Sequence, residues 1–290
     1  MSLNIMDGRS LAQKIKESLK KRVLSLKEHA CFPGLAVILV GENPASHMYV
    51  EMKVRQCQEV GIKSFQHILP ENVSQQDLSS LINSLNQDHQ IHGILLQLPL
   101  PEHLNTDTLI DQIDPRKDVD GLTKINIGGL VRQEKSAFIP CTPKGCLKLL
   151  ETYTGELSGK TAVIIGRSHL VGRPLVQLLL QKNCTVSIVH SKTHTPENLT
   201  CQADIVIAAV GQARLVKKSW IKPGAAVVDV GINRSDDIDS GKLVGDVDFD
   251  DVASVAGYLT PVPGGVGPMT VACLLENTLE SAERWCSWTS

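Results

Sequence analysis

The sequence predicts an α/β protein built from two domains. Short apolar runs rich in β-branched residues alternate with stretches of helical hydrophobic spacing along nearly the whole chain, which is typical of parallel sheets covered by helices. A length of 290 residues exceeds the usual size of one domain. A polar interval with glycines at 124–140 separates two such alternating series. We therefore expect each series to fold as its own domain.

The first series begins with apolar residues at helical spacing and then alternates strand and helix. Asn43 and Pro44 are typical of the N-cap and first position of a helix, and Gly61 is typical of the residue that ends one. Ser74 is a second candidate N-cap. We expect helices at 10–29, 44–60, 74–88 and 104–113, and strands at 35–40, 62–69 and 91–96.

The second series follows a connecting helix at 143–153. Its apolar runs predict strands at 161–165, 185–189, 204–209 and 225–230, with helices between them. A last helix runs to about Trp285 and follows the final strand without a partner of its own, so we expect it to pack back onto the first domain. The predicted boundaries are 1–142 plus 270–290 for the first domain and 143–269 for the second.

The turn after the strand 161–165 has the composition of an anion site. The strand stops at Gly166, and Gly172 opens a helix in which Pro174 suits the first turn. Such a turn leaves backbone N–H groups at the positive end of a helix, where the pyrophosphate of a dinucleotide fits. Ser168 stands where the usual fingerprint has its second glycine, so an ordinary strand-to-helix turn remains the alternative. We interpret the second domain as Rossmann-like.

The end of the next strand favours NADP over NAD. Sites for NAD place an acidic residue near this point to bind the ribose 2′-hydroxyl, but no acid occurs between Val189 and Glu197. Ser191 and Lys192, together with Arg167 of the preceding turn, are suited to a 2′-phosphate.

The composition excludes several classes of protein. Lys plus Arg is 29 and Asp plus Glu is 31, so the net charge is −2, which gives no electrostatic footprint for nucleic acid or an anionic membrane. No apolar run approaches the roughly 20 residues of a membrane helix. The N-terminal stretch lacks the apolar segment of a signal peptide. We expect a cytoplasmic protein.

The eight cysteines predict neither disulfides nor a metal site. No Cys-x-x-Cys occurs, the closest pair being Cys141 and Cys146, and most cysteines lie among apolar neighbours, where a thiol behaves as a small hydrophobic group. His89 and His92 have ligand-like spacing, but no further ligands converge on them.

Polar residues that follow the strands of the first domain are the candidate catalytic groups, because ligands bind beyond the carboxyl ends of parallel strands. Tyr49 and Lys53 lie four residues apart on one helix face. Gln97 follows a strand, and Asp118 and Asp120 lie in a turn-rich loop. Each has a structural alternative: a solvated lysine beside a half-buried ring, a polar turn residue, and carboxylates bonded to local backbone.

Five motifs occur together and in order, and they carry a resemblance to a known family. They are Tyr49–Lys53, Gln97–Pro101, Lys117–Gly121, Gly166–Pro174 and Pro261–Thr270. The chain resembles the bifunctional methylenetetrahydrofolate dehydrogenase/methenyltetrahydrofolate cyclohydrolases of the bacterial FolD type, nearly from end to end. The resemblance implies a cleft between the two domains and a homodimer.

The resemblance also implies a function and a set of site residues. Hydride passes from 5,10-methylenetetrahydrofolate to NADP, and the methenyl product is hydrolysed to 10-formyltetrahydrofolate. Lys53, Gln97, Tyr49 and Asp120 are the implied catalytic residues, with Lys53 as general acid/base. The implied cofactor site comprises Gly166, Arg167, Ser168, Ser191 and Ile232. The implied folate site comprises Tyr49, Val50, Glu51, Met52, Lys53, Leu96, Gln97, Leu98, Asp120, Pro263, Gly264, Gly265, Val266 and Gly267.

Two alternatives remain at this point. One is an NADP oxidoreductase that acts on a carbonyl or amine substrate other than folate. The other is a nucleotide sensor without catalytic activity, which has no use for Lys53 beside Gln97. A comparison of substrates separates the first from the folate enzyme, and cofactor binding without turnover identifies the second.

Overall fold

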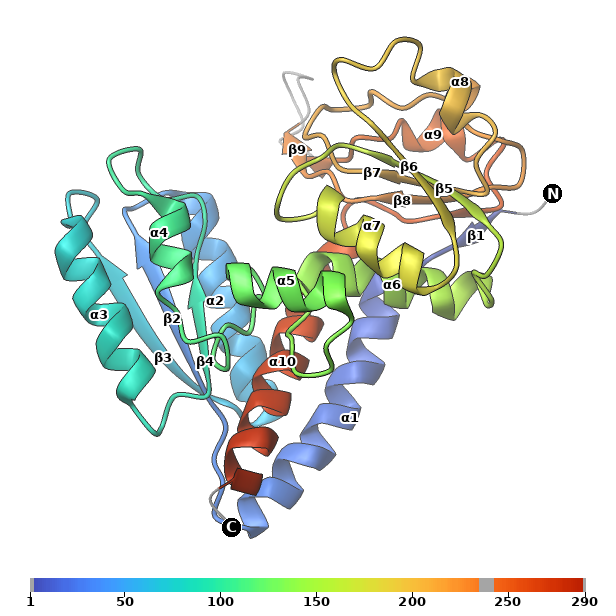
Figure 1. The fold of residues 1–290 in the computed structure, drawn as a ribbon. Coiled ribbons are helices and arrows are strands. Elements are labelled where there is room, and N and C mark those ends of the chain that lie inside the picture. The colour runs from blue at the N-terminus through green and yellow to red at the C-terminus, as the bar shows by residue number, and fades with distance from the viewer. Residues whose placement is uncertain (1–2, 235–242, 289–290) are drawn as a thin grey trace. The chain divides into compact units, whose positions relative to one another are not determined.

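The computed structural model describes residues 3–234 and 243–288 of the chain (Figure 1). It divides into two compact units, one of residues 1–12 and 142–270 and the other of residues 13–141 and 271–290. We name them the six-stranded unit and the three-stranded unit after their main sheets. Two helices, α1 (Gly8–Glu28) and α10 (Val266–Trp288), begin in the six-stranded unit and continue in the three-stranded unit.

The three-stranded unit is a parallel sheet in the order β3-β2-β4. Every residue of the central strand is buried, as expected for a strand covered by helices on both faces. Residues of α10, among them Leu275 and Leu279, lie in one core cluster with β2, so the predicted packing of the last helix is confirmed. The elements are β2 (Gly34–Val40), α2 (Pro44–Val60), β3 (Lys63–Leu69), α3 (Gln75–Gln87), β4 (Gly93–Leu96), α4 (Thr106–Asp111) and α5 (Lys124–Arg132).

The predicted ends of α2 and α3 are confirmed. Asn43 accepts a hydrogen bond from the Ser46 backbone N–H, and Ser74 caps α3 by accepting from the Asp77 N–H. Gly61 follows the end of α2 with a φ of +86°, a conformation that side chains rarely adopt. The Asn43 cap fixes the start and phase of α2, and hence the face on which Lys53 lies.

The six-stranded unit is a parallel sheet in the order β1-β11-β8-β7-β5-β6. Helices follow its strands as in a Rossmann-like domain. The elements are β1 (Asn4–Ile5), α6 (Cys141–Thr154), β5 (Thr161–Ile165), α7 (Gly172–Gln181), β6 (Thr185–Val189), α8 (Glu197–Thr200), β7 (Ile205–Ala208), the 3₁₀ helix η1 (Lys218–Trp220), β8 (Ala226–Asp229), the antiparallel pair β9 (Asn233–Arg234) and β10 (Leu243–Val244), α9 (Phe249–Val252) and β11 (Tyr258–Leu259).

The structure differs from the expected organisation in two places. Residues 1–12 fall in the six-stranded unit rather than with the first domain, because β1 pairs with β11 across most of the sequence. The interval 124–140 contains the helix α5 rather than a plain connection. Thr123 caps α5, and Gly129 is required there because a Cβ at this position would lie 2.6 Å from that of Ala137.

The expectation that no cysteine forms a disulfide was wrong. Cys31, between α1 and β2, is bonded to Cys286 near the end of α10. The cysteines are 255 residues apart in the sequence, so neither their spacing nor their neighbours indicated the pair. Within the described ranges, no helix has the length and apolar composition that crossing a bilayer requires.

Candidate active site

Lys53 and Gln97 meet at the carboxyl end of the three-stranded sheet. Lys53 lies on α2, and Gln97 directly follows β4. The Lys53 Nζ donates a hydrogen bond of 2.8 Å to the Gln97 Oε1, and the Gln97 Nε2 donates to the Leu98 carbonyl at 2.7 Å. The second bond fixes which end of the amide faces the lysine. Tyr49, half-buried, lies one turn before Lys53 on the same helix.

Burial at this site favours neutral side chains. Burial lowers the pKa of Lys53 below its ordinary value, against an opposing effect of the Asp120 carboxylate. Burial also raises the pKa of Asp120, although the Lys53 charge opposes the change. The Cys57 thiol has its pKa raised to about 12 by burial and stays protonated. An amine whose proton is more easily lost, held by a neutral acceptor, is suited to general base chemistry.

Asp118 and Asp120 have different roles, although only one residue separates them. The Asp118 carboxylate is buried and accepts hydrogen bonds from the Gly121, Leu122 and Thr123 backbone N–H groups and from the Asn126 side chain, at 2.8–3.1 Å. It therefore stabilises the loop, as the structural alternative predicted. Asp120, in contrast, interacts electrostatically with Lys53.

Lys117 is a buried structural residue whose role its motif does not reveal. Its side chain is fully buried, and its Nζ donates to the Leu85 and Asp88 carbonyls at 3.0 and 2.7 Å. These carbonyls lie at the C-terminal end of α3, where a helix favours a positive charge. Lys117 thus anchors the loop that carries Asp120.

The remaining residues of the expected folate site are placed in different environments. Val50 and Leu96 are 2% and 4% exposed and belong to the hydrophobic cores, so they offer no side-chain surface to a ligand. Glu51 is exposed, and Met52 and Leu98 are half-buried. Residues 263–267 belong to the six-stranded unit, where Gly264 has a φ of +120°.

The glycine turn after β5 is closely packed against its neighbours. Gly166 has a φ of +114°, and a Cβ there would lie 2.2 Å from the Ala209 carbonyl oxygen. A Cβ at Gly172 would lie 2.3 Å from the Gly166 oxygen. The Ser168 Oγ accepts hydrogen bonds from the N–H groups of Val171 and Gly172, so part of the donor set predicted for an anion is bonded within the turn.

Polar residues lie at the same edge of this sheet and fit a phosphorylated dinucleotide. In the parallel register Ile165 pairs with Val189, so Arg167 and Ser191 follow neighbouring strands. Arg167, Ser168, Ser191 and Lys192 are exposed. Ile232, just beyond β8, is 47% exposed. The charge and hydroxyl groups suit phosphate, and the exposed Ile232 suits an apolar ring face.

Asp246 shapes the neighbouring loop and was missed in the sequence. It is fully buried and accepts hydrogen bonds from the backbone N–H groups of Val210, Gly211 and Gln212 at 2.6–3.0 Å. This holds the turn after β7, which the Gly166 turn contacts. The adjacent Asp229 accepts from the Asp246 N–H, and burial raises the pKa of its carboxyl to about 7.

Comparison with known proteins assigns the family. The family model for the catalytic domain of tetrahydrofolate dehydrogenase/cyclohydrolase matches residues 6–120, and the model for its NAD(P)-binding domain matches residues 140–286. The chain belongs to this family.

Relatives and solved structures agree with this membership. The chain is 52% identical over 281 residues to "Bifunctional protein FolD 2" of Paracoccus denitrificans, which covers 97% of this chain and 93% of the relative. The FolD crystal structure from Campylobacter jejuni is 50% identical, with a TM-score of 0.95 and coverage of 98% and 99%. The Trypanosoma brucei FolD structure, complexed with NADP and an inhibitor, is 38% identical, with a TM-score of 0.93 and 98% coverage of both chains.

Proposed function

We propose that this family member catalyses two consecutive reactions of one-carbon metabolism. It oxidises 5,10-methylenetetrahydrofolate to 5,10-methenyltetrahydrofolate with NADP, and it hydrolyses the methenyl compound to 10-formyltetrahydrofolate. The observation that carries the second reaction is the 2.8 Å hydrogen bond between Lys53 and Gln97, with the Asp120 charge acting on the same lysine. Neither a nucleotide sensor nor a general oxidoreductase accounts for this arrangement.

Lys53 acts as the general base of hydrolysis in this proposal. The methenyl carbon is cationic, and a positive charge beside it disfavours the ammonium form of Lys53 in addition to the burial that already lowers its pKa. The neutral amine takes a proton from the water that attacks the methenyl carbon, and the resulting ammonium returns a proton to the ring nitrogen that leaves. Gln97 holds the amine in position throughout.

Hydride transfer requires position rather than a side-chain acid. Bound NADP accepts the hydride at its nicotinamide. The protein must hold the methylene carbon within near-attack distance of the nicotinamide. Holding it there is the main contribution of the substrate-binding residues. We assign Tyr49 to the folate pocket wall, Asp120 to the pterin and 263–267 to further folate contacts. The residues assigned to the cofactor are Gly166, Arg167, Ser168, Ser191 and Ile232.

The preference for NADP rests on Arg167, Ser191 and Lys192. All three are exposed at one sheet edge, where they can bind the 2′-phosphate, and the sequence has no Asp or Glu between Val189 and Glu197. Rates at equal concentrations of NADP and NAD test the assignment, and a preference for NAD would contradict it. We also propose that the protein is cytoplasmic and that it is a homodimer, the second as the resemblance implies. Sedimentation of the purified protein tests the homodimer.

The decisive experiment substitutes Lys53. In Lys53→Met, we expect decay of methenyl absorbance in stopped flow to slow by about 100-fold or more, while NADP affinity stays within about twofold. Lys20→Met, which removes an exposed lysine of α1, is the matched control and should retain both. An unchanged rate of hydrolysis in Lys53→Met would exclude Lys53 as the base.

A further inference from the structure

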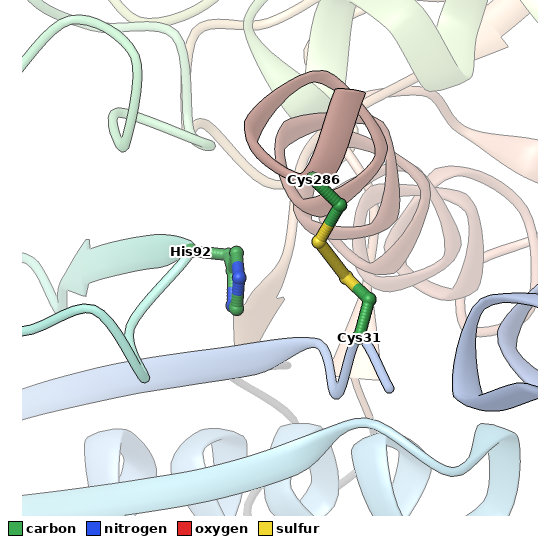
Figure 2. A group of neighbouring side chains, drawn as sticks. All are labelled: Cys31, His92 and Cys286. Carbon is green, nitrogen blue, oxygen red and sulfur yellow. A yellow bond between two sulfur atoms is a disulfide. The ribbon is translucent and has the colours of Figure 1, made fainter. Parts of the chain in front are cut away.

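The disulfide lies at the edge of the three-stranded sheet opposite the candidate active site. Figure 2 shows Cys286 of α10 joined to Cys31, with the His92 ring beside the pair. Cys31 shortly precedes the start of β2, and His92 directly precedes β4, whereas Gln97 follows the end of β4. This group is therefore separate from Lys53 and Gln97 and has no part in the reactions proposed above.

A pocket of about 830 Å³ borders both cysteines. Two lysines, Lys27 and Lys63, contribute to its wall, and none of its lining residues is Asp or Glu. Its charge therefore attracts anions, and thiolates are anions. The lining residues are Lys27, Ala30, Cys31, Phe32, Pro33, Gln58, Gly61, Ile62, Lys63, His89, Gln90, His92, Trp285 and Cys286.

His92 decides between two uses of this group. One of its ring nitrogens and the two sulfurs lie within 4.8 Å of one another, a spacing that also suits a metal ion. However, the Gly34 backbone N–H donates to the His92 Nδ1 at 3.2 Å, so the neutral ring carries its proton on Nε2. A metal at Nδ1 would displace this bond, and a metal at Nε2 would move the proton to Nδ1, opposite another donor. The hydrogen bond favours the disulfide.

We propose that Cys31 and Cys286 form a reversible redox site that reacts with the thiolate of a dithiol entering through this pocket. A thiolate of the dithiol attacks one sulfur, the Cys31–Cys286 bond breaks, and a mixed disulfide forms. The second thiol of the reagent then displaces the remaining cysteine. Two electrons and two protons pass to the cysteines, which become thiols, while the dithiol becomes a disulfide. Oxidation runs the same steps in reverse.

The closed bond fixes the last turns of α10 to the segment that leads into β2. Trp285 is next to Cys286, and the centroid of its ring lies 5.0 Å from the Arg116 guanidinium and 5.3 Å from the Lys117 Nζ. A link across 255 residues also restricts the unfolded chain strongly. Oxidation should therefore stabilise the three-stranded unit, and reduction should loosen the end of α10.

The test equilibrates the purified full-length protein in buffers of reduced and oxidised dithiothreitol. Thiols are then alkylated and located by mass spectrometry, and thermal unfolding is recorded at each ratio. We expect Cys31 and Cys286 to become labelled together on reduction and protected together on reoxidation. The thermal midpoint of the oxidised protein should exceed that of the reduced protein by roughly 5–10 °C.

Three variants and one metal addition make the test decisive. Cys31→Ser and Cys286→Ser should each abolish the redox-dependent shift, whereas Cys201→Ser, which removes a partly exposed thiol elsewhere, should retain it. Two thiols that stay labelled at every ratio would overturn the proposal. So would reduced protein that binds one equivalent of Zn²⁺ through these cysteines and resists reoxidation, because the group would then be a metal site.

Discussion

Replacing Gln97 with glutamate tests whether hydrolysis depends on a neutral Lys53. The substitution keeps the shape of the side chain but places a carboxylate where the amide oxygen now lies, 2.8 Å from the Lys53 Nζ. At an effective dielectric constant of about 20, two unit charges at this distance attract by about 6 kcal/mol. Lys53 is partly exposed, and solvent reduces the attraction, so we take about half of it as the working value.

A stabilisation of the ammonium by about 3 kcal/mol lowers the neutral fraction of Lys53 by roughly 100-fold. We therefore expect the cyclohydrolase rate of Gln97→Glu at pH 7 to fall by about this factor and to recover as the pH rises. The measurement is the decay of methenyl absorbance between pH 6 and pH 10, with the rate in the absence of enzyme subtracted. Dehydrogenase activity with NADP is followed in parallel.

Gln97→Met is the matched control, since it removes the hydrogen bond without adding a charge. This variant should lose the orientation of the amine, and its rate of hydrolysis should fall. Because burial already lowers the pKa of Lys53, this rate should not recover at high pH. If Gln97→Glu and Gln97→Met share one pH profile, the protonation state of Lys53 does not limit hydrolysis and our mechanism is wrong.

Two predictions concern stability. The Asp229 carboxyl has its pKa raised to about 7 from an ordinary 3.8, so the unfolded chain loses this proton first as the pH rises. The free energy of unfolding should therefore fall by about 3–4 kcal/mol between pH 4 and pH 7, and Asp229→Asn should remove this slope in urea titrations. Lys117→Met removes one buried and one partly buried ammonium–carbonyl hydrogen bond and should cost about 3 kcal/mol. Arg116→Met, which removes an exposed ion pair with Asp114 and the contact of the guanidinium with the Trp285 ring, should cost less than about 1 kcal/mol, and equal losses would contradict the assignment.

Local signals in the sequence were sufficient to place one half of the candidate site. Asn43 and Gly61 delimit α2, and the helical period then puts Tyr49 and Lys53 on one face. The strand ending before Gln97 predicts that this side chain lies at the carboxyl edge of the sheet. Caps and strand ends depend on residues close in sequence, and so they can be recognised without coordinates.

The loop 117–121 shows why a motif does not reveal the role of each residue in it. Its three charged residues make three different interactions: Lys117 binds carbonyls at the end of α3, Asp118 binds the backbone of its own loop, and Asp120 interacts with Lys53. A turn changes the direction of the chain at each residue, so neighbouring side chains in sequence point to unrelated surroundings. Composition predicts a ligand-binding or turn-forming loop there. It does not predict which carboxylate is available to a ligand and which one binds the backbone of the loop.

Contacts between distant segments are the part that the sequence could not supply. The pairing of β1 with β11 and the bond between Cys31 and Cys286 join residues about 250 positions apart. The bond joins the segment after α1 to the end of α10, and each of these helices begins in one unit and continues in the other. The partner of Cys31 is set by the length and phase of α10, a helix of 23 residues in which one residue more or fewer would turn Cys286 by about 100° away from Cys31. The same packing that completes the core with Leu275 and Leu279 therefore also determines whether a redox site exists.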